Sequence, residues 1–436
     1  MNKIPGRKQT RRDFITSGTV AAASALAGFS IVRNAWGQNT DPIRAGLIGC
    51  GGRGTGAAEN YLMAAPNVSL VALADLYRDR LDRCKANLSD PDREGGPLKG
   101  YEVTEDRCFV GFDAYKQLID SGVDLVLLAT PPGFRPIHFE YAVKAGKHVF
   151  AEKPVAVDPV GVRKFIEVGE LAKQKGLAVV AGTQRHHSVP FIEAVKRVQD
   201  GQIGEILAAR CYYNTGFLWE RERKPGMSDM EWQTRNWYYF KWLSGDHIVE
   251  QHIHNLDNVN WVLDSLPVRC LGIGGRQVRT APLYGNIYDH FTIDYEYPGG
   301  IHMMSMCRQM GNTDMKICVE IVGTKGNAIM HQDIRLWQTG ENPWRYRGSR
   351  TGSVVIGHQQ EHTDMIGSIR SGNPLNHARR IAESTLTAIM GRESAYSGNL
   401  VEWDEIMASQ QDLVPRKFEF GPLPIRPVPM PGQYKG

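Results

Sequence analysis

The chain has 436 residues, of which 42% are hydrophobic and 22% charged, and its formal net charge is +4. This composition is ordinary for a globular enzyme and excludes a coiled coil or a largely disordered protein. The length exceeds what one hydrophobic core usually organises, so two domains are expected.

The first 37 residues have the pattern of an export signal. Arg11 and Arg12 precede residues 20–32, an apolar stretch rich in alanine and short for a membrane span. With Phe14 after the arginine pair and small residues at 35 and 37, the segment resembles a twin-arginine signal. We therefore predict a periplasmic or otherwise extracytoplasmic protein; an uncleaved anchor is the alternative.

This segment also holds most of the excess positive charge. It contains six of the 51 basic residues and one of the 47 acidic residues, so the rest of the chain has a net charge of −1. Neither nucleic acid nor an anionic membrane is therefore expected as a partner.

A glycine-rich turn follows the first apolar strand. Residues 45–48 run into the letters GCGGRG, and the next segment can be helical. Glycines permit a tight turn and close approach of the backbone to a pyrophosphate, which the helix N-terminus then binds. The residues expected to hold a dinucleotide here are Gly49, Gly51, Gly52, Arg53 and Gly54.

Further apolar strands support this interpretation, because a lone GxGxxG pattern is weak. They cover residues 68–75, 123–132, 147–154 and 177–185 and alternate with helix-like segments. Asp75 lies about 20 residues beyond the glycines, where a carboxylate accepts ribose hydroxyls and favours NAD over NADP. Alternating strands and helices predict an α/β fold, a doubly wound parallel Rossmann sheet over residues 41–185. A nucleotide-free α/β domain is the alternative.

The pattern of the second half predicts an α+β domain. Strand-like segments at 203–214, 290–309 and 315–332 are separated by glycine-containing turns. We expect this domain over residues 186–375. Residues 376–436 should form closing helices and a proline-rich tail that wraps a neighbouring surface or stays mobile.

The order of several short motifs resembles the Gfo/Idh/MocA family of sugar and polyol oxidoreductases. The motifs are the glycine loop, ATP at 129–131, His138 before GKH at 146–148, EKP at 152–154, and GTKG at 323–326. The resemblance covers nearly all of the chain after the signal. It implies a Rossmann domain, NAD as cofactor, and a second domain whose open, mostly antiparallel sheet holds a small sugar substrate. It also implies a homo-oligomer formed through the outer face of that sheet.

The resemblance assigns further residues to the cofactor site. Thr130, Pro131, His138 and Glu152 are expected to line it, together with Lys153, which would lie near both nicotinamide and substrate. A lysine at this place can hydrogen-bond the reacting hydroxyl and stabilise the developing alkoxide. A lysine that only caps a strand end is the alternative.

Residues 245–257 concentrate histidines and carboxylates. The family's substrate helix carries an acid, a histidine four residues later and an acid three beyond; Glu250, His254 and Asp257 fit this, although Asp is common where Glu250 stands. On an α-helix these positions share one face, so we expect all three to point together. His247 falls on the same side, whereas His252 points away.

Alcohol oxidation needs a base within hydrogen-bond reach of the hydroxyl. We predict that His254 is this base and that Glu250 orients it or binds a neighbouring hydroxyl. A metal site at His247, Glu250 and His254 is the alternative, but the spacing is not HExxH and the seven cysteines are dispersed, so no metal is expected. A purely structural helix is a further alternative.

Four residues are expected to contact substrate: Arg185, Tyr239, His247 and Asp257. Arg185 follows the last Rossmann strand and could instead form an interdomain salt bridge. Tyr239 belongs to an aromatic segment, residues 212–242, that suits stacking on sugar rings or a subunit interface.

An exported enzyme has no free NAD pool, so the cofactor would be loaded before export and recycled within each cycle. The sequence thus predicts an NAD-dependent oxidoreductase acting on a sugar or glycoside. Two alternatives stay open. One is an NAD-dependent glycosidase that oxidises C3 transiently, eliminates the C1 substituent, adds water and reduces again. The other is a non-catalytic sugar-binding protein.

Overall fold

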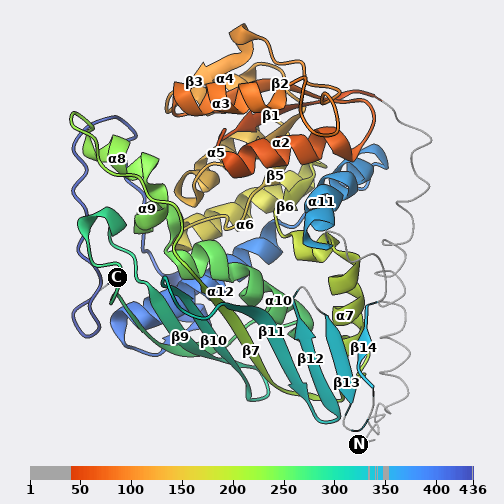
Figure 1. Cartoon of the computed structure of the whole chain (residues 1–436), viewed down its shortest axis with the longest axis vertical. Coiled ribbons are helices and arrows are strands. Elements are labelled where there is room, and N and C mark those ends of the chain that lie inside the picture. Colours follow the sequence, from red (N-terminus) through yellow and green to blue (C-terminus); the bar gives the residue numbers. More distant parts are fainter. Residues whose placement is uncertain (1–40, 332–333, 339, 341, 347–352, 435) are drawn as a thin grey trace, which may run out of the picture.

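The computed structural model describes residues 41–331, 334–338, 340, 342–346, 353–434 and 436. The export signal expected at residues 1–37 lies outside them. The described chain forms a Rossmann domain above a second domain built on a wide curved sheet (Figure 1). Within the described residues, no helix combines the length and apolar character needed to cross a membrane.

The Rossmann sheet has six strands. In spatial order they are β3 (Cys108–Val110), β2 (Val68–Asp75), β1 (Ile43–Ile48), β4 (Leu125–Leu128), β5 (His148–Ala151) and β6 (Val179–Ala181). Every pair is parallel, which confirms the predicted doubly wound sheet. The order reverses between β1 and β4, and ligands of open α/β sheets bind at such a point.

Helices cover both faces of this sheet. They are α2 (Gly52–Ala64), α3 (Arg78–Leu88), α4 (Ala114–Asp120), α5 (Arg135–Lys144) and α6 (Pro159–Gln174). Side chains of α2 and α3 share one core with Met365 and Ile366 of α11 (Ser353–Arg370), whereas α4, α5 and α6 belong to the other core. Helix α11, which the sequence analysis places in the second domain, therefore packs on the first.

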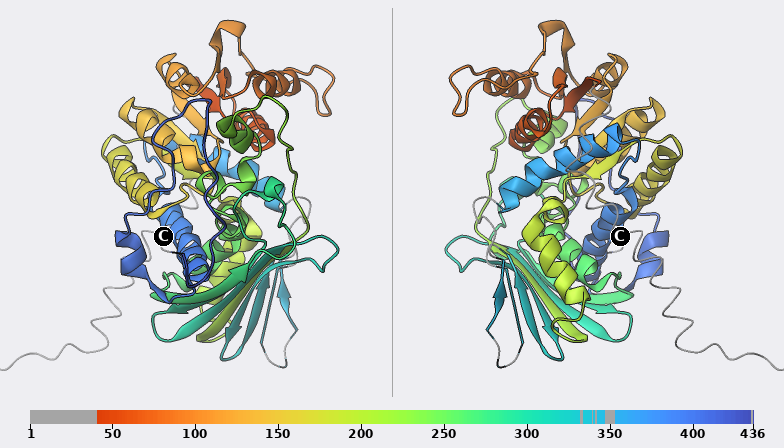
Figure 2. Two further views of the ribbon diagram at one scale, coloured as in Figure 1. Left: turned by 90° about the vertical axis from the view of Figure 1, so that its left-hand side faces the viewer. Right: turned by 90° about the vertical axis from the view of Figure 1, so that its right-hand side faces the viewer.

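The second sheet has nine strands within the described part of the chain. In spatial order they are β14 (Trp344–Arg345), β13 (Arg335–Gln338), β12 (Gly326–Met330), β11 (Lys316–Gly323), β7 (Ile206–Thr215), β10 (Ile301–Gln309), β9 (His290–Tyr297), β8 (Arg269–Gly275) and β15 (Val401–Glu402). Among the strands that the structure describes, only β7 and β10 pair in parallel in this sheet, so the expected mostly antiparallel sheet is confirmed. Helices lie on one face of it (Figure 2).

The remaining helices connect the two sheets. They are α7 (Val189–Gln199), α8 (Asp229–Arg235), α9 (Lys241–Ser244), α10 (Ile253–Leu263), α12 (Ala378–Ser397) and α13 (Trp403–Ala408), with a π-helical turn, η5 (Ile248–His252), before α10. Short 3-10 turns are η1 (Glu105–Arg107), η2 (Pro132–Phe134), η3 (Gln184–His187), η4 (Trp237–Tyr239) and η6 (Pro282–Tyr284).

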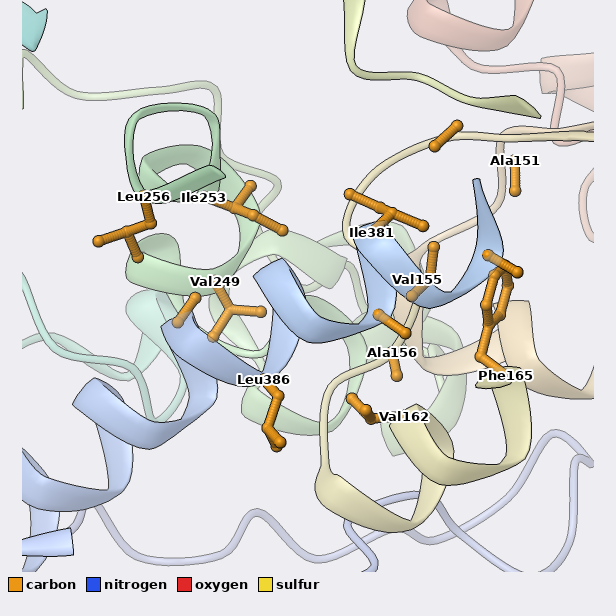
Figure 3. Packing of buried hydrophobic residues seen from close by; sticks show 14 of the residues in the cluster. Ala151, Val155, Ala156, Val162, Phe165, Val249, Ile253, Leu256, Ile381 and Leu386 are labelled. Carbon is orange, nitrogen blue, oxygen red and sulfur yellow. The ribbon is translucent and has the colours of Figure 1, made fainter. Parts of the chain in front are cut away.

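Helix α12 joins the domains through a common core. Its Ile381 and Leu386 lie between Val155 and Phe165 of the Rossmann domain on one side and Ile253 of α10 on the other (Figure 3). All five side chains are fully or almost fully buried. Each such aliphatic or aromatic side chain contributes about 1.5–3 kcal/mol on burial, so the core fixes η5 and α10 against β5.

Candidate functional site

A cleft of about 1340 Å³ is lined by both domains. The Rossmann side supplies the glycine loop and the carboxyl ends of β2, β4 and β5, and the other side supplies residues of η4, η5 and α10. Small-molecule pockets usually measure about 300–1,000 Å³, so this cleft has room for a dinucleotide and a second molecule.

The glycine loop has the geometry that a pyrophosphate site requires. Gly49 has φ +101°, and a Cβ there would lie 2.6 Å from the carbonyl carbon of Ala129. A Cβ on Gly54 would lie 1.8 Å from the Gly49 carbonyl oxygen, so both positions exclude a side chain. Helix α2 starts at Gly52 with no side-chain cap and no acid in its first turn, which leaves its N-terminal amides available to an anion.

Asp75 stands at the end of β2 and faces the same cleft. Its Oδ2 accepts the amide of Cys50 at 2.7 Å and its Oδ1 accepts the amide of Tyr77 at 2.9 Å. Burial raises the pKa of Asp75, and the two amide hydrogen bonds offset part of this effect. Each oxygen keeps a lone pair for a ribose hydroxyl, so the side chain fits the expected role.

All of the predicted cofactor residues line the cleft, including Thr130, Pro131 and His138. The His138 ring stacks on Tyr115 at 4.1 Å, and burial lowers its pKa to about 3, so the imidazole is neutral. Arg53 donates to Glu152 and thereby connects the glycine loop to the EKP segment. That these residues bind the cofactor stays a prediction.

The three predicted catalytic residues also line the cleft. The Lys153 ammonium donates to the Glu250 carbonyl oxygen and lies 3.2 Å from the Glu250 Oε1. The Glu250 Oε2 accepts from Gln251 at 2.6 Å. Burial and then the Lys153 cation lower the pKa of His254 well below its usual value, so its imidazole is neutral and able to accept a proton.

The expected single α-helix over 245–257 is wrong in one respect. Residues 248–252 form the π-helical turn η5, and regular α-helix begins at Ile253. A π turn adds a residue to the turn and shifts the phase of the helix. Glu250 and His254 therefore face the cleft while Asp257 does not.

Asp257 does not contact the cleft, contrary to the prediction that it binds substrate. Its Oδ2 lies 2.7 Å from the His186 Nε2, and its Oδ1 accepts from Ser384 at 2.7 Å and from Arg380 at 3.3 Å. His186 stacks on Trp261 with ring centroids 4.0 Å apart. The carboxylate thus fixes α10 against α12 and η3.

His247, another expected substrate contact, is fully buried and does not line the cleft. Its Nδ1 lies 2.9 Å from the Asp246 Oδ1, and its ring packs on Phe291. His252 points away as predicted, with its Nε2 2.7 Å from the Ser305 Oγ in the sheet.

Neither Arg185 nor Tyr239, the other two expected substrate contacts, lines the cleft. Arg185 is buried and donates to the His254 carbonyl at 2.9 Å and to the Asn255 Oδ1 at 2.5 Å, so it holds the backbone of α10. Tyr239 is fully buried and donates to the Trp219 carbonyl at 3.0 Å. From the aromatic segment 212–242, the residues that line the cleft are Trp219, Trp237 and Tyr238.

Several polar residues that line the cleft could not be predicted from the sequence, among them Gln251 and His358. Gln251 follows Glu250 and accepts from Tyr213 at 2.9 Å. His358 comes from α11, about 100 residues after the substrate helix. Neither carries a motif, and only the packing of α11 on α2 brings His358 to the cleft. Within the described residues, no group of three or more His, Cys, Asp or Glu is arranged to hold a metal ion.

Comparisons with known proteins match both halves of the chain to family models. Residues 43–183 match the oxidoreductase family with an NAD-binding Rossmann fold, and residues 191–329 match the GFO/IDH/MocA C-terminal domain. The myo-inositol 2-dehydrogenase structure from Lactobacillus plantarum has a TM-score of 0.63 at 20% identity, covering 83% of this chain and 99% of that one. That likeness concerns the fold alone.

Curated relatives span several activities. An inositol 2-dehydrogenase of Rubrobacter xylanophilus is 26% identical over 71% of this chain and 79% of its own length. A 2,7-anhydro-N-acetylneuraminate hydratase of Escherichia coli is 29% identical over 47% of this chain and 51% of its own length. A glycosyl hydrolase family 109 protein of Streptomyces niveus is 28% identical over 45% and 38%. The chain therefore carries both domains of the Gfo/Idh/MocA oxidoreductases, the NAD-binding Rossmann domain and the C-terminal domain, and its cofactor is NAD.

Proposed function

We propose that this protein oxidises a hydroxyl of a sugar or glycoside with NAD that stays bound and is recycled within each catalytic cycle. The observation that carries the proposal is the meeting of Lys153, Glu250 and His254 in the cleft that also holds the glycine loop and Asp75. A dehydrogenase site needs this combination of a nucleotide cradle, a cation for the reacting oxygen and a neutral base.

The chain's own residues can share the proton chemistry. NAD, when bound, accepts a hydride from the carbon that carries the hydroxyl. Burial and the Lys153 cation keep His254 neutral, so its imidazole is able to accept the hydroxyl proton. The negative charge that develops on the substrate oxygen would then stabilise the imidazolium. Lys153 has three ammonium donors and directs two to Glu250, so the third is available to the substrate oxygen.

A second candidate is a redox-neutral elimination on a glycoside, favoured by the Glu250 carboxylate beside His254. After C3 is oxidised, the proton on C2 becomes acidic and a second base removes it, the C1 substituent leaves, water adds, and the ketone is reduced again. Simple oxidation needs one base, whereas this route needs two in one cleft. The relatives named as a hydratase and as a glycosyl hydrolase family 109 protein support this elimination as the second candidate.

Export and internal recycling belong to the same proposal. Arg11 and Arg12 support secretion of the folded protein with NAD already bound. Outside the cytoplasm, a second carbonyl substrate or the re-reduction step would then restore NAD. The homo-oligomer implied by the family resemblance stays a prediction.

Three measurements test the proposal. The purified protein is denatured and the released nucleotide is measured, then the native protein is given free sugars or aryl glycosides in deuterated water. Oxidised sugar with reduced bound cofactor supports the dehydrogenase, and cleavage with deuterium at C2 supports the elimination. Lys153→Met should lower either rate by about 10²–10⁴-fold while the protein keeps its NAD. A protein with no nucleotide and no affinity for NAD would refute both routes and favour a sugar-binding protein.

A further inference from the structure

Helix α8 of the second domain reaches the Rossmann domain beside Asp75. The Thr234 Oγ1 lies 2.5 Å from the Tyr77 Oη, and the Arg235 guanidinium lies 3.7 Å from the centre of the Tyr77 ring. Arg235 also donates to Asp79 at 3.1 Å. Tyr77, Thr234 and Arg235 all line the cleft, so α8 bridges the two domains next to the carboxylate expected to hold a ribose.

The C-terminal tail fastens α8 in this position. The amide of Leu423 donates to the Asp229 Oδ2 at 3.0 Å, and the Gln233 side chain donates to the Leu423 carbonyl at 2.6 Å. Phe420 packs on Tyr77 with ring centroids 6.0 Å apart. The tail runs past α8 on the outside of the molecule (Figure 1).

A second aromatic contact fixes the tail to the Rossmann domain itself. Phe112, which lines the cleft, lies 5.0 Å from the Phe420 ring and 6.2 Å from the Phe418 ring. Phe418 also packs on Phe134 at 5.2 Å. The tail therefore touches the Rossmann domain and α8 at the same time.

We infer that α8 and residues 418–423, together called the clamp, hold NAD in the cleft as a resident group. The inference rests on the proposed function, in which NAD is retained rather than exchanged. With the clamp in place, the ribose end of the cleft is bounded by Asp75 and Tyr77 on one side and by Thr234 and Arg235 on the other. NAD leaves only when α8 separates from Tyr77. The contacts are aromatic and polar, not covalent, so they permit loading and then slow release.

The clamp can be weakened without disturbing a core. Phe420 is 51% exposed, so Phe420→Ala removes its contacts with Tyr77 and Phe112 and opens no internal cavity. Arg235→Met removes the cation above Tyr77 and the ion pair with Asp79. Met430→Ala is the matched control, because Met430 is 56% exposed in the same tail and does not line the cleft.

The experiment measures the dissociation rate of radiolabelled NAD from the full-length protein after addition of excess unlabelled NAD. We expect Phe420→Ala and Arg235→Met each to release label about tenfold faster or more, with Met430→Ala unchanged. Release at the wild-type rate from both variants would overturn the clamp while leaving the proposed function standing. A wild-type protein that binds no NAD would overturn both.

Discussion

The buried carboxylate of Asp257 should govern stability and not substrate affinity. Asp257→Asn removes the negative charge opposite Arg380 and turns an amide group toward donors at Ser384 and His186. Removing one partner of a buried ion pair costs about 3–5 kcal/mol. The Arg380 side chain is 31% exposed, so solvent compensates part of this loss and we expect about 3 kcal/mol.

The assay is urea denaturation, followed by kcat and KM at a temperature where the variant is fully folded. The midpoint should fall clearly for Asp257→Asn, and KM should stay within a factor of two or so of the wild-type value. Asp294→Asn is the control, because this carboxylate is 56% exposed and its pair with His302 should contribute about 0–1 kcal/mol. An unchanged midpoint combined with a large rise in KM would show that Asp257 contacts substrate and that our reading of α10 is wrong.

Three further substitutions test one residue of the glycine loop and two histidines of the segment 245–257. His254→Asn should lower kcat by about 10²–10⁴-fold. Because the pKa of His254 is held well below its usual value, kcat/KM of the wild-type protein should stay level as pH falls from 7.5 through 6.5. A decline centred at or above pH 6.5 would contradict this prediction. Gly54→Ala should give a protein that loses NAD during purification, because the new Cβ meets the Gly49 oxygen at 1.8 Å; retained NAD would count against the loop's role. Burial lowers the pKa of His252 to about 3, so the stability this residue contributes is complete above pH 6.5 and is lost as pH falls toward 3. The loss at pH 4.5 should be about 3 kcal/mol, and unfolding measured at pH 7.5 and 4.5 should show a smaller loss in His252→Gln.

The Rossmann half could be predicted because its signals are local. Strands buried on both faces read as continuous apolar runs, and β2 occupies the residues 68–75 that the sequence indicated. Strand β3 was missed because its three residues, Cys108–Val110, are half-buried or exposed and lie at the edge of the sheet. A strand of three residues is too short to show a periodic signal.

A helix does cover most of residues 245–257, but the direction of its side chains differs from the prediction. Glu250 and Asp257 lie on one helix face only if the helix keeps 3.6 residues per turn between them. The π-helical turn at 248–252 interrupts that periodicity. The start of this turn is fixed by contacts that spacing cannot show. Asp246 has φ +77°, and its Oδ2 accepts from the Tyr288 amide at 2.7 Å and the Tyr396 hydroxyl at 2.5 Å.

Residues far apart in the chain complete the cleft, and this explains which site residues the sequence could supply. Lys153 and the glycine loop belong to βα units, where the loop after each strand already faces the ligand edge of the sheet. His358 reaches the cleft through the packing of α11 on the Rossmann domain, and Arg235 through the position of α8 beside Tyr77. The residues expected to bind the cofactor could therefore be predicted from sequence motifs. The other residues that line the cleft depend on long-range packing, for which a single sequence carries no periodic signal.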